Sequence, residues 1–137
     1  MNRTERWPKT AAADHVYLSY AYLNARDYDA LASLLDADVV FRGPEGVVAS
    51  GREDVIAAEK RRRFVYTLDE IWSAAGRMVV TGILRQPEPG CPEVDFAAIF
   101  VMSECGLIVS RRTYVSGIIP DEADTGTGTG RIVSMEA

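Results

Sequence analysis

The second half of the chain contains four strand-length segments separated by turn residues, and this pattern constrains the fold more than any other feature. The segments span residues 64–73, 77–85, 94–102 and 107–116. The connections "AAG" and "SECG" are short, and "QPEPGCPE" is too rich in proline and glycine to form regular structure. Short connections join antiparallel neighbours, so the sequence predicts an antiparallel sheet in this half.

Helical spacing dominates the first half. Val16, Tyr20 and Leu23 give residues 12–24 one inward stripe, and a second helix is expected over 27–35 with Asp27 as its cap. A short strand around 39–41 and its partner "GVVAS" precede a third helix, which we expect to begin at Ser50. Helices placed early and antiparallel strands placed late predict an α+β fold, with helices on one face of a curved sheet.

Length and charge limit the classes of protein that need to be considered. The 137 residues suit one domain over 12–120, with a loose arm at 1–11 and a flexible, Thr-Gly-rich tail at 121–137. A net charge of −5 argues against general nucleic-acid binding, and neither a membrane span nor a secretory signal is expected. Cys91 and Cys105 form no metal-binding pattern, which favours free thiols, a cytoplasmic location and no metal or other cofactor.

Two stretches, "ARDYDALASLLDADVVFRGP" and "SECGLIVSRRTYVSG", together with the order of elements, resemble the nuclear-transport-factor-2-like superfamily, in its SnoaL-like and ketosteroid-isomerase-like branch. The resemblance covers roughly residues 12–118. It implies a cone, in which a curved antiparallel sheet wraps around three N-terminal helices and leaves a deep apolar pocket. Members include isomerases, polyketide cyclases, epoxide hydrolases, hydroxylating proteins and binding modules, so the fold alone does not give the reaction.

The resemblance also shows that the ketosteroid-isomerase machinery is missing. An ungapped comparison places the general base of that enzyme on Gly43, its tyrosine on Ser19 and its second acid on Ala98. A glycine cannot accept a proton, and an alanine cannot donate to an oxyanion. An enzyme with this sequence therefore has to use other groups.

Strand alternation under the same comparison supplies the other candidates. We expect Arg111 to stabilise an anion, Tyr20 to donate a hydrogen bond and Asp95 to act as a possible base, although alternation turns Asp95 away from the pocket. A buried Arg111 needs a partner, such as a substrate carboxylate, an enolate or Asp95; a register shift would instead place it in solvent. Trp72 can line either the pocket or the core. The predicted substrate-binding residues are Ser19, Phe41, Phe96, Phe100, Thr113 and Trp72.

Two surface features point to partners. Ala97, Ile99 and Val101 make the outer face of the late strands apolar, which predicts a homodimer through that face. The run Lys60–Arg63 suits a helix C-terminus, where cations interact favourably with the helix dipole, or serves as a docking patch for an acidic partner such as a carrier protein.

These observations predict a SnoaL-like, cofactor-free enzyme that acts on a hydrophobic natural-product ligand by isomerisation, cyclisation, or epoxide or ring opening. The alternatives are a non-catalytic binding or accessory module with the same cone, and a pure dimerisation scaffold. The missing acids at positions 43 and 98 favour a binding module, whereas Arg111 and the several phenols favour an enzyme.

Overall fold

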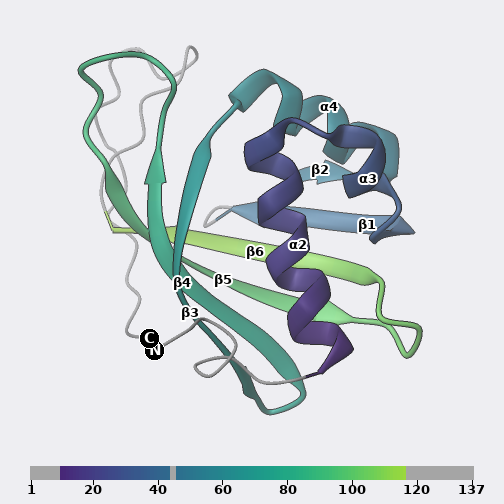
Figure 1. Ribbon diagram of the computed structural model, residues 1–137. Helices are drawn as coiled ribbons and strands as arrows, with labels where there is room; N and C mark the ends of the chain where they lie inside the picture. The colour runs from purple at the N-terminus through teal and green to yellow at the C-terminus, as the bar shows by residue number, and fades with distance from the viewer. Residues whose placement is uncertain (1–9, 44–45, 117–137) are drawn as a thin grey trace.

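The computed structural model describes residues 10–43 and 46–116 (Figure 1). Along the chain its elements are α2 (Ala11–Ala25), α3 (Tyr28–Ala32), β1 (Leu35–Gly43), β2 (Gly46–Ser50), α4 (Arg52–Arg62), β3 (Val65–Ala74), β4 (Arg77–Arg85), β5 (Val94–Met102) and β6 (Ile108–Val115). The tail expected at 121–137 and nearly all of the arm expected at 1–11 lie outside the described residues.

The strands form a six-stranded sheet in the order β2-β1-β6-β5-β4-β3. All neighbouring strands are antiparallel except β1 and β6, which run parallel. Figure 1 shows the sheet curving around α2, with α3 and α4 beside it near β1 and β2. The predicted α+β cone is confirmed, with one parallel pair within a sheet that is otherwise antiparallel.

The late strands were predicted closely, whereas two helix ends differ. The third helix begins at Arg52, because Ser50 still pairs with Val40 in the β1–β2 ladder. Gly51 takes the N-cap position with φ 92, so the predicted start of this helix at Ser50 is wrong. The second helix ends at Ala32, because Leu35 already belongs to β1.

The core lies between α2 and the concave face of the sheet. Val16, Tyr20 and Leu23 on α2 are all buried, as their helical spacing predicts. Opposite them, strand pairing aligns the buried side chains of Met78, Phe100, Arg111, Phe41 and Ala49 in one row across β4, β5, β6, β1 and β2. Arg111 therefore lies in the middle of an apolar row, and it must be neutralised there.

Candidate functional site

The charge of Arg111 is neutralised by Glu59, which α4 carries into the interior. Arg111 Nη2 donates to Glu59 Oε2 at 3.1 Å, and the two side chains are only 7% and 4% exposed. Glu59 faces inward because it lies four residues after the buried Val55, on the same face of the helix. The pair joins α4 to β6 and places two opposite charges inside the cone.

Arg111 also lies against an aromatic ring. Its guanidinium carbon is 3.9 Å from the centroid of the Phe41 ring, a cation–π geometry that is strongest away from water. Burial by itself lowers the pKa of Arg111, but Glu59 and the phenols Tyr66 and Tyr20 outweigh burial, so the pKa is raised. Arg111 is therefore a fixed positive charge at any physiological pH.

Tyr20 brings a phenol from α2 to the same region. Its ring is 4.8 Å from Tyr66, 5.7 Å from Phe96 and 5.9 Å from Phe100, measured between ring centroids. Burial raises the pKa of Tyr20 far above its ordinary value; Arg111 lowers it and Glu59 raises it further. The hydroxyl therefore keeps its proton, and it can act as a hydrogen-bond donor but not as a base.

Several polar atoms in this interior have no partner. The hydroxyl of Tyr20, Nε of Arg111 and the hydroxyl of Thr113 are all buried, and no described residue makes a hydrogen bond to them. Most buried polar groups in folded proteins are paired, because leaving one unpaired costs about 1–3 kcal/mol. The interior thus offers hydrogen-bond donors that the protein itself does not use.

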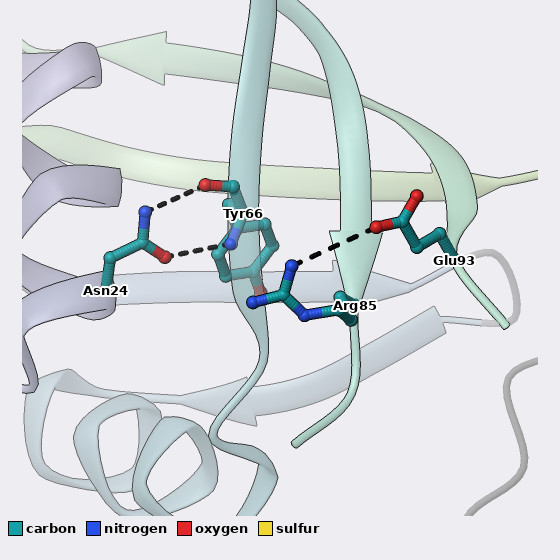
Figure 2. A network of polar contacts seen from close by, with 4 residues as sticks. All are labelled: Asn24, Tyr66, Arg85 and Glu93. Atoms are coloured by element: carbon teal, nitrogen blue, oxygen red, sulfur yellow. Dashed lines mark hydrogen bonds and ion pairs between the residues drawn. The ribbon is translucent and has the colours of Figure 1, made fainter. Parts of the chain in front are cut away.

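A second phenol, Tyr66, is held in place through its backbone. The side-chain amide of Asn24 donates to Tyr66 O and accepts from Tyr66 N, both at 2.8 Å (Figure 2). This two-point clamp fixes the start of β3 beside the C-terminal end of α2. Burial, followed by the charge of Glu59, raises the pKa of Tyr66, so this phenol also stays protonated.

Two of the predicted residues do not lie in this interior. Asp95 is exposed, and it pairs across the sheet with Ile83, which is also exposed. Glu59 pairs with Arg111 instead, so the expectation that Asp95 could do so is wrong. Trp72 is 40% exposed, because it follows the buried Ile71 and alternation turns it to the outer face. It lines neither the interior nor the core.

The other predicted residues face inward. Phe41, Phe96, Phe100 and Ser19 are buried, and the Ser19 hydroxyl donates to Val16 O at 2.7 Å within α2. Thr113 is half-buried and lies opposite Ala98 in the next row of the concave face. Their contact with a ligand stays a prediction.

Glu59 is the main residue that sequence reasoning missed. It directly precedes the charged run Lys60–Arg63, although its four-residue spacing from Val55 marks the apolar face of the helix. As for metals, no set of three or more His, Cys, Asp or Glu side chains is placed to hold an ion within residues 10–43 and 46–116.

The fold and this interior define a nuclear-transport-factor-2-like α+β cone. The family model described as "SnoaL-like domain" matches residues 16–111, and the chain belongs to this family. A comparison with curated proteins gives no match.

Solved structures of the same fold include a putative ketosteroid isomerase from Kribbella flavida, with a TM-score of 0.69, 14% identity and coverage of 90% of this chain and 94% of that one. RV0760c from Mycobacterium tuberculosis, in complex with estradiol-17beta-hemisuccinate, has a TM-score of 0.67 and 18% identity over 77% and 93%. TerC, co-crystallized with polyporic acid, has a TM-score of 0.65 and 19% identity over 76% and 90%.

Proposed function

We propose that this chain is a small-molecule enzyme that works without a cofactor on a largely apolar substrate bearing an oxygen acceptor. The observation that carries the proposal is a pair of unpartnered donor atoms, the Tyr20 hydroxyl and Arg111 Nε, beside the buried carboxylate of Glu59. Two proteins of the same fold hold oxygenated ring compounds, estradiol-17beta-hemisuccinate and polyporic acid, which supports a ligand of this class.

The chemistry that best fits these groups is proton transfer through an enolate. Glu59 would take a proton from carbon next to a substrate carbonyl, and the electron pair would move onto the carbonyl oxygen. The Tyr20 hydroxyl and Arg111 Nε would donate to that oxygen, where negative charge develops. Return of the proton to a different carbon completes an isomerisation with no net change in charge or oxidation state. Cyclisation and ring opening can proceed through the same anion.

Tyr20→Phe tests this role, because it keeps the ring and removes only the hydroxyl. We expect it to weaken binding of estradiol-17beta-hemisuccinate and polyporic acid, used as probes, by about tenfold. Conversion of a β,γ-unsaturated cyclic ketone to its conjugated isomer, followed by ultraviolet absorbance, should slow by about a hundredfold. Tyr22→Phe makes the same chemical change on the same helix at a half-buried site and is the control.

The proposed role of Tyr20 is wrong if Tyr20→Phe and Tyr22→Phe behave alike in both measurements. If Tyr20→Phe weakens binding while neither the wild type nor the variant converts the ketone, the binding part stands and this catalytic reaction does not. A screen with epoxide and polyketone substrates would then be the next step.

A binding or accessory module is the second candidate. The groups that ketosteroid isomerase requires are missing from Gly43 and Ala98, and Ala98 is fully buried in the concave face. The Glu59 carboxylate also accepts a hydrogen bond from Arg111 Nη2, so a substrate proton would have to compete with that contact. Tight binding with no turnover across the substrate screen would favour this candidate.

We further propose that the chain forms a homodimer through the outer face of the sheet. Trp72, Val79 and Ile99 lie in one row there, and Trp72 is 40% exposed. Exposed apolar surface of this kind is commonly covered by a partner. Ile99→Lys should give a monomer in sedimentation velocity. A wild-type protein that already sediments as a monomer would contradict this proposal.

The cytoplasmic location also remains a proposal. It is supported by Cys91 and Cys105, both of which are free thiols. Within the described residues, no helix combines the length and the apolar character needed to cross a membrane.

A further inference from the structure

Four consecutive cations end α4 and continue just beyond it. Lys60, Arg61, Arg62 and Arg63 are all exposed, and none forms an ion pair with another described residue. The whole chain carries a net charge of −5, so this segment opposes the overall charge of the molecule. We call residues 60–63 the basic segment.

The basic segment is connected to the interior through aromatic rings. The guanidinium of Arg62 lies 5.9 Å from the Phe64 ring centroid, and Phe64 lies 6.3 Å from Tyr66. Tyr66 in turn lies 4.8 Å from Tyr20. The charge of Arg62 also acts to lower the pKa of Tyr66, although burial and Glu59 outweigh it. A series of ring contacts therefore links exposed Arg62 to Tyr20, whose hydroxyl is unpartnered.

The C-terminal end of α2 adds another arginine at this end of the molecule. Asn24 holds α2 beside the start of β3, and Arg26 follows two residues later with one buried, unpartnered guanidinium nitrogen. Arg26 and Arg63 both adopt the left-handed conformation, with φ 57 and φ 55, which is unfavourable for an L-residue. The neighbouring Asp27 is exposed, and its carboxylate accepts from Ala30 N at 3.2 Å.

We propose that the natural ligand is an amphiphilic anion, with an oxygenated apolar body in the interior and a terminal carboxylate, sulfonate or phosphate against Arg62 and Arg63. This inference rests on the proposed function, because it names the substrate class of the same site. Guanidinium groups bind such anions through paired hydrogen bonds, which suits two adjacent arginines.

The helix dipole alone does not account for these cations. It favours positive charge in the last turn and its effect decreases beyond that turn, whereas Arg63 follows the helix in a strained conformation that glycine would adopt more easily. An acidic protein surface would fit exposed cations, but it would not account for the ring contacts that connect Arg62 with the interior. The arrangement therefore favours a small ligand that spans both regions.

A matched pair of fluorescent probes tests this inference. 8-Anilinonaphthalene-1-sulfonate and N-phenyl-1-naphthylamine have the same ring system, and only the first carries an anion. We expect the sulfonate to bind the wild type roughly tenfold more tightly than the neutral probe at low salt, and the two probes to compete. Arg62→Gln combined with Arg63→Gln should remove that difference and leave the neutral probe unaffected. Arg77→Gln, an exposed arginine at the far end of β3 and β4, is the matched control.

The outcomes separate this inference from the proposed function. If both probes bind equally well and the double variant changes neither, Arg62 and Arg63 do not bind the anionic group; this inference is then overturned, and the proposed interior site is not. If the double variant loses binding of both probes equally, Arg62 and Arg63 have a structural role, and this inference is also overturned. If neither probe binds the wild type, the proposal that the interior binds a ligand is itself contradicted. Binding of poly-L-glutamate that requires Arg62 and Arg63, with sulfonate binding unaffected, would assign the basic segment to an acidic polypeptide instead.

Discussion

Helix α4 presents charge to two different environments within five residues. Glu59 is buried and pairs with Arg111, whereas Lys60 through Arg63 are exposed and form no ion pair with another described residue. The buried pair must be kept neutral, because a single charge in the interior is very costly. The exposed cations can be changed at little cost to folding. The buried charge of Glu59 therefore matters for folding, whereas the exposed charges of Lys60–Arg63 are available for recognition.

The largest effect should come from breaking the buried pair. Arg111→Met leaves Glu59 buried without its partner, which should lower the free energy of unfolding by about 3–5 kcal/mol. Arg111→Met combined with Glu59→Leu should recover most of that loss, because no charge is then left in the interior. Urea unfolding monitored by circular dichroism measures both variants.

This result also decides how the role of Arg111 in ligand binding can be tested. Because Arg111 contacts Glu59, a loss of ligand binding in Arg111→Met alone would combine an effect on folding with an effect on the ligand. The double variant is the proper test of ligand binding. If Arg111→Met proves as stable as the wild type, Glu59 does not depend on Arg111 for neutralisation.

The next effect concerns alkaline pH and the two buried phenols. The pKa values of Tyr20 and Tyr66 are raised in the folded state, mainly by burial, so the folded protein holds these protons more tightly than the unfolded chain. The part of the unfolding free energy that depends on these protons is fully present below about pH 10, the pKa of a tyrosine in the unfolded chain. It is lost as the pH rises above that value. Each phenol should lower the unfolding free energy by about 1.4 kcal/mol per pH unit there.

Unfolding curves measured at several alkaline pH values check this prediction, with tyrosinate absorbance as a second signal. Tyr20→Phe should roughly halve the slope of stability against pH, because it removes one of the two phenols. A slope that is the same in wild type and variant would show that Tyr20 ionises as easily in the folded protein as in the unfolded one.

The sequence predicted the fold well because the fold depends on patterns that many residues share. Alternation in 94–102 and the spacing of Val16, Tyr20 and Leu23 are redundant signals, and both elements formed as expected. Phe96, Phe100 and Arg111 could be placed on the concave face for the same reason.

The site was harder to predict because it depends on single side chains from distant segments. The charged neighbours of Glu59 hid its inward face, and no local pattern says that a residue on α4 will meet one on β6, 52 positions away. Trp72 was wrongly predicted to bind substrate, because a tryptophan next to an apolar residue can lie on either face of a strand. Asp95 faces outward, as strand alternation predicted. The alternation was therefore a better guide to its position than the need for an acidic residue in the site.

A smaller effect should distinguish donors kept for a ligand from donors needed for folding. The Tyr20 hydroxyl has no partner in the described structure, so Tyr20→Phe should raise the free energy of unfolding near neutral pH by about 1–2 kcal/mol. Thr113→Val should act in the same direction, since its hydroxyl is also unpartnered. Thermal unfolding measures both. A loss of stability in either variant would mean that the hydroxyl has a partner essential for folding.

The smallest effect concerns the exposed end of α4. Arg63 has φ 55 in the position that glycine favours after a helix, so Arg63→Gly should stabilise the protein by up to about 1 kcal/mol. Arg61→Gly, inside the last turn, should instead destabilise it by a similar amount, because glycine weakens a helix interior. If Arg63→Gly is stabilising and also weakens binding of the anionic probe, then the chain keeps an arginine in an unfavourable conformation at a site where its charge is useful. If it stabilises without affecting the probe, the conformation of Arg63 has no connection with ligand recognition, and Arg62 alone would have to hold the anion.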